Sequence, residues 1–147
     1  MTPDLEQIPE GYSRHFRSSP LTEPWEPLYS KAENGAILLA LRIRHAHCNS
    51  RGIAHGGLIS ALADNAMGLS LSEALGERHK ERPSGLVTIT LSLDFLGAGR
   101  VDQWLEFVPR VLRAGGSLGF VDCLIRADDQ PIARGNATFR IFRPDED

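Results

Sequence analysis

The sequence has little cysteine, no long apolar run and no signal-like N-terminus, and each shortage excludes a class of protein. Its two cysteines, Cys48 and Cys123, have no CxxC spacing, so no disulfide framework is expected. The longest apolar run, Ala36 to Leu41, is far shorter than the roughly 20 residues that a membrane-spanning helix needs. The acidic N-terminus lacks the basic start and apolar core of a signal peptide. We therefore expect a cytoplasmic protein with free thiols and no membrane partner.

The chain also lacks a basic excess. It has 16 Lys and Arg against 19 Asp and Glu, a net charge of -3, so we expect no nucleic-acid partner. Its 147 residues fit a single domain, 1–147. Five of the nine prolines lie within residues 1–27, which we interpret as an irregular N-terminal arm with at most a brief helix over Ser13 to Arg17.

Hydrophobic periodicity predicts one long helix. A glycine-rich turn, His55-Gly56-Gly57, runs into apolar and small residues as far as Leu75, and Gly76 is well placed to end the helix. The charged segment 77–83 is then expected to be a loop. Alternating apolar and polar residues predict six strands, over residues 28–32, about 36–44, 86–96, 101–113, 117–127 and 132–142.

Four details of these strands can be predicted. Asn34-Gly35 favours a two-residue hairpin turn, and the strand after it should bury only one face. Pro109 should lie at a bulge or an edge position. In strand 86–96 one face should pack the core, because five apolar residues alternate without a break: Val87, Ile89, Leu91, Leu93 and Phe95. The element order predicts an α+β protein with the hotdog fold, an antiparallel β-sheet curled around one long central helix.

A lone carboxylate, Asp64, lies in the apolar part of this helix. Burying a carboxylate is costly, which suggests a purpose, although a structural group bonded to Thr88 or Ser60 would also explain it. The glycine turn presents backbone amides at a positive helix end, where an anion or oxyanion can bind. His55 and Asp64 are about 13 Å apart at helical rise, too far to hold one carbonyl. We therefore expect a site made by two chains.

These features together resemble the hotdog-fold acyl-coenzyme A thioesterases of the PaaI-like group. The resemblance covers roughly residues 20–143. The residues that carry it are Asn49, Gly52, His55-Gly56-Gly57, Ala63-Asp64, Gly68, Pro27-Leu28-Tyr29, Gly115-Gly116-Ser117 and the stretch 133–139.

The resemblance implies hydrolysis of an aryl- or short- to medium-chain acyl-CoA thioester. Asp64 corresponds to the carboxylate that acts as nucleophile or general base, and Gly57 to the backbone amide that polarises the carbonyl. Asn49, His55 and Thr88 correspond to side chains of the same pocket. Coenzyme A enters only as part of the substrate, so no cofactor or metal is implied. The family also implies a homodimer that shares the site, and commonly a homotetramer.

Substrate contacts follow from the same resemblance. The phosphates of coenzyme A need cations, and Arg113 and Arg134, with Ser117, are the candidates near the 115–116 turn. We expect Leu58, Leu62 and Met67, together with aromatic residues of the arm, to line the acyl pocket.

Simpler interpretations remain open for several of these residues. Asn49 can merely shape its turn, His55 can cap the helix, and Thr88 can be an ordinary β-branched strand residue. At the level of function, the alternatives are a non-catalytic acyl-CoA-binding hotdog protein, and a hotdog dehydratase or hydratase with a different arrangement of histidine and acid.

Zinc binding is not expected. Strand alternation would put His45 and His47 on one face but Cys48 on the other, and no fourth ligand follows with finger-like spacing.

Overall fold

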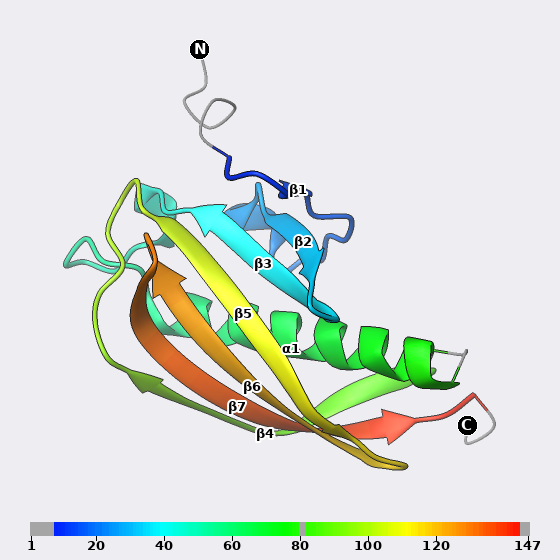
Figure 1. Ribbon diagram of the computed structural model, residues 1–147. Coiled ribbons are helices and arrows are strands. Elements are labelled where there is room, and N and C mark those ends of the chain that lie inside the picture. Colours follow the sequence, from blue (N-terminus) through cyan, green and yellow to red (C-terminus); the bar gives the residue numbers. More distant parts are fainter. Residues whose placement is uncertain (1–7, 80–81, 145–147) are drawn as a thin grey trace.

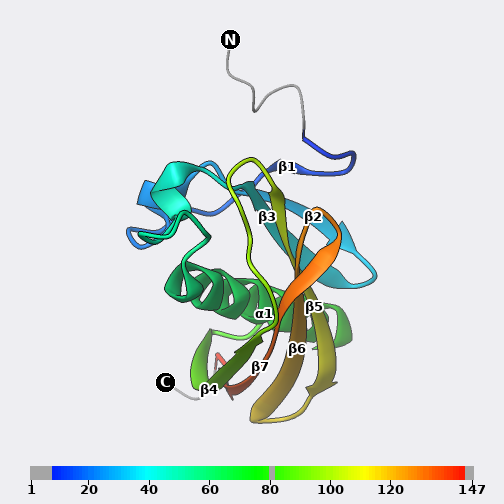
Figure 2. The ribbon, with the colours of Figure 1, turned by 90° about the vertical axis from the view of Figure 1, so that its left-hand side faces the viewer.

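The computed structural model describes residues 8–79 and 82–144. In it, one long helix packs against a seven-stranded antiparallel sheet (Figure 1). The strand order is β1-β2-β3-β5-β6-β7-β4, and the two edge strands β1 and β4 lie on opposite sides of the helix (Figure 2). This confirms the predicted sheet curled around one helix. Predictions for residues 1–7 of the arm, 80–81 of the loop and 145–147 fall outside the described residues.

The elements in chain order are β1 Ser13–Arg14, the 3-10 helix η2 Glu23–Trp25, β2 Tyr29–Glu33, β3 Ala36–Arg42, the 3-10 helix η3 His45–His47, α1 Gly56–His79, β4 Gly85–Phe95, β5 Trp104–Ala114, β6 Leu118–Ala127 and β7 Gln130–Phe142. No helix in the described ranges is long and apolar enough to cross a membrane.

Two predicted boundaries are wrong. Helix α1 continues past Gly76 to His79, and the chain that returns after it packs on its last turns through an ion pair of 2.7 Å between Arg82 and Glu73. The brief helix over Ser13 to Arg17 does not form, because residues 13–14 pair with β2 instead. In the second case a contact with a distant strand overrides the short local signal.

The β2–β3 hairpin forms as predicted. Asn34 and Gly35 have φ angles of 52° and 78°, as a type I′ turn requires. The prediction that β3 buries one face is wrong: Leu39 and Leu41 belong to the main core, while Leu38 and Ala40 on the other face are also 1% exposed. The arm causes part of this burial, since its residues Ile8 and Tyr12 pack on the small cluster that contains Ala40.

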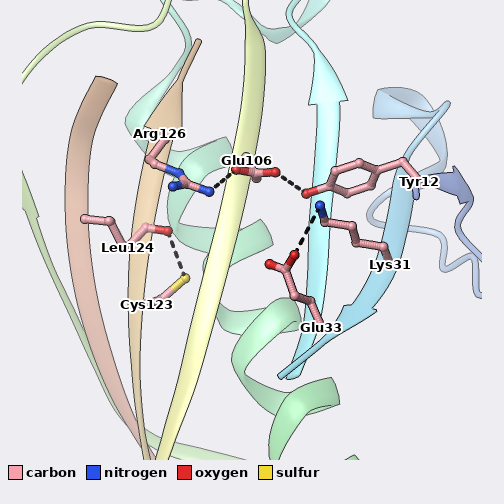
Figure 3. Close-up of polar contacts among 7 residues, drawn as sticks. All are labelled: Tyr12, Lys31, Glu33, Glu106, Cys123, Leu124 and Arg126. Carbon is pink, nitrogen blue, oxygen red and sulfur yellow. Dashed lines mark hydrogen bonds and ion pairs between the residues drawn. The ribbon is translucent and has the colours of Figure 1, made fainter. Parts of the chain in front are cut away.

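The arm is anchored to the sheet by a buried carboxylate. Glu106 on β5, only 8% exposed, accepts hydrogen bonds from the Tyr12 hydroxyl and from the Arg126 guanidinium of β6 (Figure 3). Burial, and then the hydrogen bond to Glu106, raise the pKa of the Tyr12 phenol well above its ordinary value, so it stays protonated as the donor. This fixes the arm at Tyr12 against the strands.

Helix α1 lies very close to the sheet. Ser70, fully buried on the helix, accepts a hydrogen bond from the Ile37 amide at 2.9 Å and donates one to the Ile37 carbonyl at 3.2 Å. On β6, a Cβ at Gly119 would lie 2.4 Å from a methyl of Leu71, so any larger residue would force this buried leucine to shift. The pairing of β5 with β3 ends at Phe107, so Pro109 has no β3 partner and lies at the predicted edge position. The bulge of β5 falls elsewhere, between residues 111 and 113.

The prediction that one face of β4 packs the core is wrong, because the strand contains a β-bulge. The register with β7 shifts between Thr88 and Thr90. Directly opposed residues share a face, so the apolar residues after the shift face the side opposite to Val87. The uninterrupted alternation in the sequence therefore does not make one core face. Four of its five members are exposed: Val87 54%, Ile89 53%, Leu91 39% and Phe95 52%.

Candidate active site

Asp64 and Thr88 meet between the helix and the edge strand. The Thr88 hydroxyl on β4 donates a hydrogen bond of 2.7 Å to Asp64 Oδ1 on α1. Both residues are partly buried. Thr88 reaches the helix because it precedes the bulge, where the strand presents this face to α1. The structure thus joins two of the predicted site residues and leaves Asp64 Oδ2 for other partners.

This pair lines a cavity of about 470 Å³ on the side of α1 that lies between the arm and β4. Helix residues spaced along one face form its floor: Asp64, Asn65, Gly68, Leu69 and Ser72. The arm supplies one wall through His15, Arg17, Ser18, Ser19 and Thr22. Residues 82–86 and Thr88 supply the opposite wall. The volume falls within the usual range for small-molecule pockets.

The glycine turn forms a second group of predicted residues. His55 Nδ1 accepts a hydrogen bond of 2.8 Å from the Gly57 amide, so the imidazole caps the helix start. Asn49 Oδ1 accepts hydrogen bonds from the amides of Arg51 at 2.9 Å and Ile53 at 3.3 Å, which closes the turn around Gly52. Within one chain, the capping and turn-shaping interpretations of His55 and Asn49 therefore describe their contacts.

The two groups lie apart in one chain. Gly57 and Asp64 are separated by about 10 Å of axial rise along the same helix. None of Asn49, His55 and Gly57 is among the described residues that line the Asp64 cavity. One chain therefore carries a carboxylate group and a turn group that do not converge.

His47, which the sequence interpretation did not assign to the site, holds the turn in place. His47 is only 1% exposed. Its Nδ1 accepts a hydrogen bond of 2.9 Å from the Arg44 amide, and its Nε2 lies 2.9 Å from the Trp25 carbonyl of the arm. Its own carbonyl accepts the His55 amide at 2.9 Å. Burial lowers the pKa of His47, which keeps it neutral with the proton on Nε2. Only the tertiary structure reveals this role, because the arm lies 22 residues earlier.

The residues predicted to bind coenzyme A lie elsewhere. Arg134 forms an exposed ion pair of 3.1 Å with Asp94, and Arg113 is exposed on β5. Both border a broad hollow of about 1010 Å³ that does not include Asp64. Ser117 is exposed in the turn between β5 and β6. The structure does not bring this set to Asp64 within one chain.

The predicted acyl-pocket residues Leu58, Leu62 and Met67 are in the hydrophobic core. They are 3%, 1% and 0% exposed, and none of the three lines the Asp64 cavity. Their side chains leave the helix on the face that packs against the sheet, so they are not available to a ligand here. The cavity instead takes its apolar surface from Leu28, Leu39, Leu69, Leu86 and Phe139.

Comparisons with known proteins agree with this architecture. The thioesterase superfamily matches residues 51–133 of the chain. A Pseudomonas aeruginosa protein named "Putative esterase PA0474" is 36% identical over 135 residues, covering 91% of this chain and 97% of its own length. Human acyl-coenzyme A thioesterase 13 is 26% identical over 109 residues, covering 73% of this chain and 74% of its own. The structure of the conserved Pseudomonas aeruginosa protein PA5202 superposes with a TM-score of 0.73 at 27% identity, covering 85% of this chain and 95% of that one. The chain therefore belongs to the thioesterase superfamily, a family of thioester hydrolases, and has the hotdog fold.

Proposed function

We propose that this protein hydrolyses acyl-CoA thioesters, with an aryl or a short- to medium-chain acyl group, to the free acid and coenzyme A. The observation that carries the proposal is the Asp64 carboxylate, held by Thr88 at 2.7 Å in an open cavity of a thioesterase-superfamily chain. A relative named acyl-coenzyme A thioesterase supports the substrate class.

Asp64 has two ways to act on the thioester. With Oδ1 fixed by Thr88, Oδ2 can attack the carbonyl carbon to give an anhydride, or it can take a proton from an attacking water. In both routes the C–S bond breaks, coenzyme A leaves as its thiol, and water supplies the hydroxyl of the acid.

The Gly57 amide would stabilise the negative charge that develops on the carbonyl oxygen, an effect worth about 3 to 4 kcal/mol per donor in other oxyanion holes. His55 Nδ1 occupies this amide within the chain at 2.8 Å. The imidazole must therefore turn aside or share the N–H when substrate binds. Asn49 would contribute its Nδ2 group, since its Oδ1 closes the turn.

We further propose that the site is completed in a homodimer. Strand β4 is an edge strand with exposed apolar side chains, which is a surface that pairs readily with a second copy. Thr88 lies near its start, and Phe95 at its end packs against Gly56, where an added Cβ would be 3.3 Å from the Phe95 ring.

The length of β4 supports the proposal of a dimer. Thr88 and Phe95 are about 23 Å apart along one extended strand. When two β4 strands pair antiparallel about a two-fold axis near Leu91, the end of one strand lies beside the start of the other. The glycine turn of one chain then approaches the Asp64–Thr88 pair of its partner. A homotetramer would use the remaining exposed apolar residues of the sheet, Leu112, Leu118, Phe120 and Leu124.

Hydrolysis can be measured on a panel of acyl-CoAs with a thiol-trapping dye. We expect Asp64→Asn to lower kcat by about 10² or more while acyl-CoA binding measured by calorimetry persists. Asp129→Asn, in the exposed β6–β7 turn, is the matched control and should keep full activity. Acyl-CoA binding without turnover of any panel member by the unaltered protein would instead establish a non-catalytic acyl-CoA-binding protein. An unchanged kcat in Asp64→Asn would refute the assigned role.

A further inference from the structure

The cavity beside Asp64 differs in character across its width. Asp64 and Thr88 lie at the β4 side, and apolar side chains such as Leu28 and Phe139 line its interior. The arm wall opposite is polar, with a histidine, an arginine, two serines and a threonine in its residues 15–22. A bound acyl group therefore meets a catalytic carboxylate at one end and a polar wall at the other.

Arg17 is the cation of this wall whose charge is not paired. The other arginine of the cavity, Arg82, is neutralised by Glu73 at 2.7 Å. Within residues 8–79 and 82–144, no carboxylate lies within 4.0 Å of the Arg17 guanidinium. The guanidinium carbon lies 6.0 Å from the centre of the Phe16 ring. A positive charge beside a ligand cavity favours an anionic group of the ligand.

His15 does not compete with this role. Its Nδ1 lies 3.0 Å from the Ser30 hydroxyl. Burial, and then the charge of Arg17, lower the pKa of His15, so the ring stays neutral near pH 7. Among the residues that line the wall, Arg17 is thus the cation and the others are neutral, while the Glu26 carboxylate, outside this lining, acts on the pKa of His15 in the opposite sense.

The segment that carries Arg17 is held on both sides. Before it, Tyr12 bonds to the buried Glu106. After it, Ser18 donates to Glu26 at 2.5 Å, and the Thr22 amide bonds to Ser19 Oγ at 3.2 Å. A wall fixed in this way can select among ligands rather than merely cover them.

We propose that Arg17 binds a carboxylate at the far end of the acyl chain, so that the preferred substrates are CoA thioesters of short dicarboxylic acids. The proposal rests on the proposed thioesterase function. With the thioester carbonyl at Asp64, the methylene groups lie against the apolar interior, and the free carboxylate reaches the arm. This orientation also keeps the ligand carboxylate away from the like charge of Asp64.

Matched substrate pairs test the proposal. Succinyl-, glutaryl- and adipoyl-CoA are compared with butyryl-, valeryl- and hexanoyl-CoA for wild type, Arg17→Met and Arg14→Met. Arg14 is the control because it is an exposed arginine of the same arm that does not line the cavity. We expect wild type and Arg14→Met to favour the dicarboxylic member of at least one pair about fivefold in kcat/KM, the worth of a well-placed exposed ion pair. In Arg17→Met this preference should vanish, because kcat/KM falls more for the dicarboxylic member of each pair than for its neutral partner.

Three outcomes would overturn the proposal. Equal or better use of the neutral members by wild type means that Arg17 selects no carboxylate. A preference that persists in Arg17→Met assigns selection to other groups. An equal loss on all six substrates in Arg17→Met assigns Arg17 to the phosphates of coenzyme A, which N-acetylcysteamine thioesters, lacking phosphates, would confirm by showing no loss. Absence of turnover on every substrate would instead refute the thioesterase function itself.

Discussion

Replacing Thr88 by valine would test whether this hydroxyl positions the catalytic carboxylate. Valine has nearly the same shape and suits a strand, so the change removes little except the 2.7 Å hydrogen bond to Asp64 Oδ1. A hydrogen bond to a charged group contributes about 1.5 to 3 kcal/mol. Because both residues are only partly buried, we take the lower end, about 1.5 kcal/mol, which corresponds to roughly a tenfold loss in kcat.

The assay is steady-state hydrolysis of the best acyl-CoA by wild type, Thr88→Val and the control Thr88→Ser, which keeps the hydroxyl. We expect Thr88→Val to lower kcat with little change in KM, and Thr88→Ser to stay within about twofold of wild type. Equal kcat values for all three proteins would refute a positioning role. So would a loss in Thr88→Val that is explained by a lower melting temperature.

Two further predictions concern stability. Gly119→Ala should lower the free energy of unfolding by about 1 to 3 kcal/mol, because a Cβ there would lie 2.4 Å from Leu71. Urea unfolding measures this change, and an unchanged midpoint would contradict the close packing of helix and sheet. Burial lowers the pKa of His47 in the folded chain below its ordinary value of 6.5. In the window between its lowered folded pKa and 6.5 the unfolded chain holds more protons, so stability should fall as the pH decreases through that window. Unfolding at several pH values should show a shallower fall in His47→Gln, and identical slopes would remove His47 from the account.

The sequence was sufficient to predict that the long helix exists, that the β2–β3 hairpin forms and that Asp64 lies on the helix, whereas β4 and β5, which follow one another in the chain, do not pair. The three correct predictions depend on local patterns: apolar residues from Leu58 to Leu75, the turn at Asn34-Gly35, and a single carboxylate, Asp64, among apolar and small residues. Such patterns survive because each is reinforced by its own packing face.

The remaining features depend on contacts between distant segments. The bulge after Thr88 is a property of the β4–β7 register and reverses the faces of later residues without changing the alternation in the sequence. Met67 looked like a pocket residue because periodicity does not say which side of a buried helix faces a ligand. The arm was expected to be irregular and to line the pocket with aromatic residues, yet it lines the cavity with polar residues such as Arg17 and Ser18 and, through Trp25, holds His47.

The measurement that tests the shared site most directly is subunit complementation. Asp64→Asn removes the carboxylate, and Gly57→Pro removes the amide donor at a helix position where proline is tolerated. Each variant alone should be nearly inactive. Mixed in equal amounts, they should recover about a quarter of wild-type activity, because about half of the dimers are mixed and each of these keeps one intact site. No recovery, with mixed dimers demonstrated by native mass spectrometry, would contradict a site built from two chains.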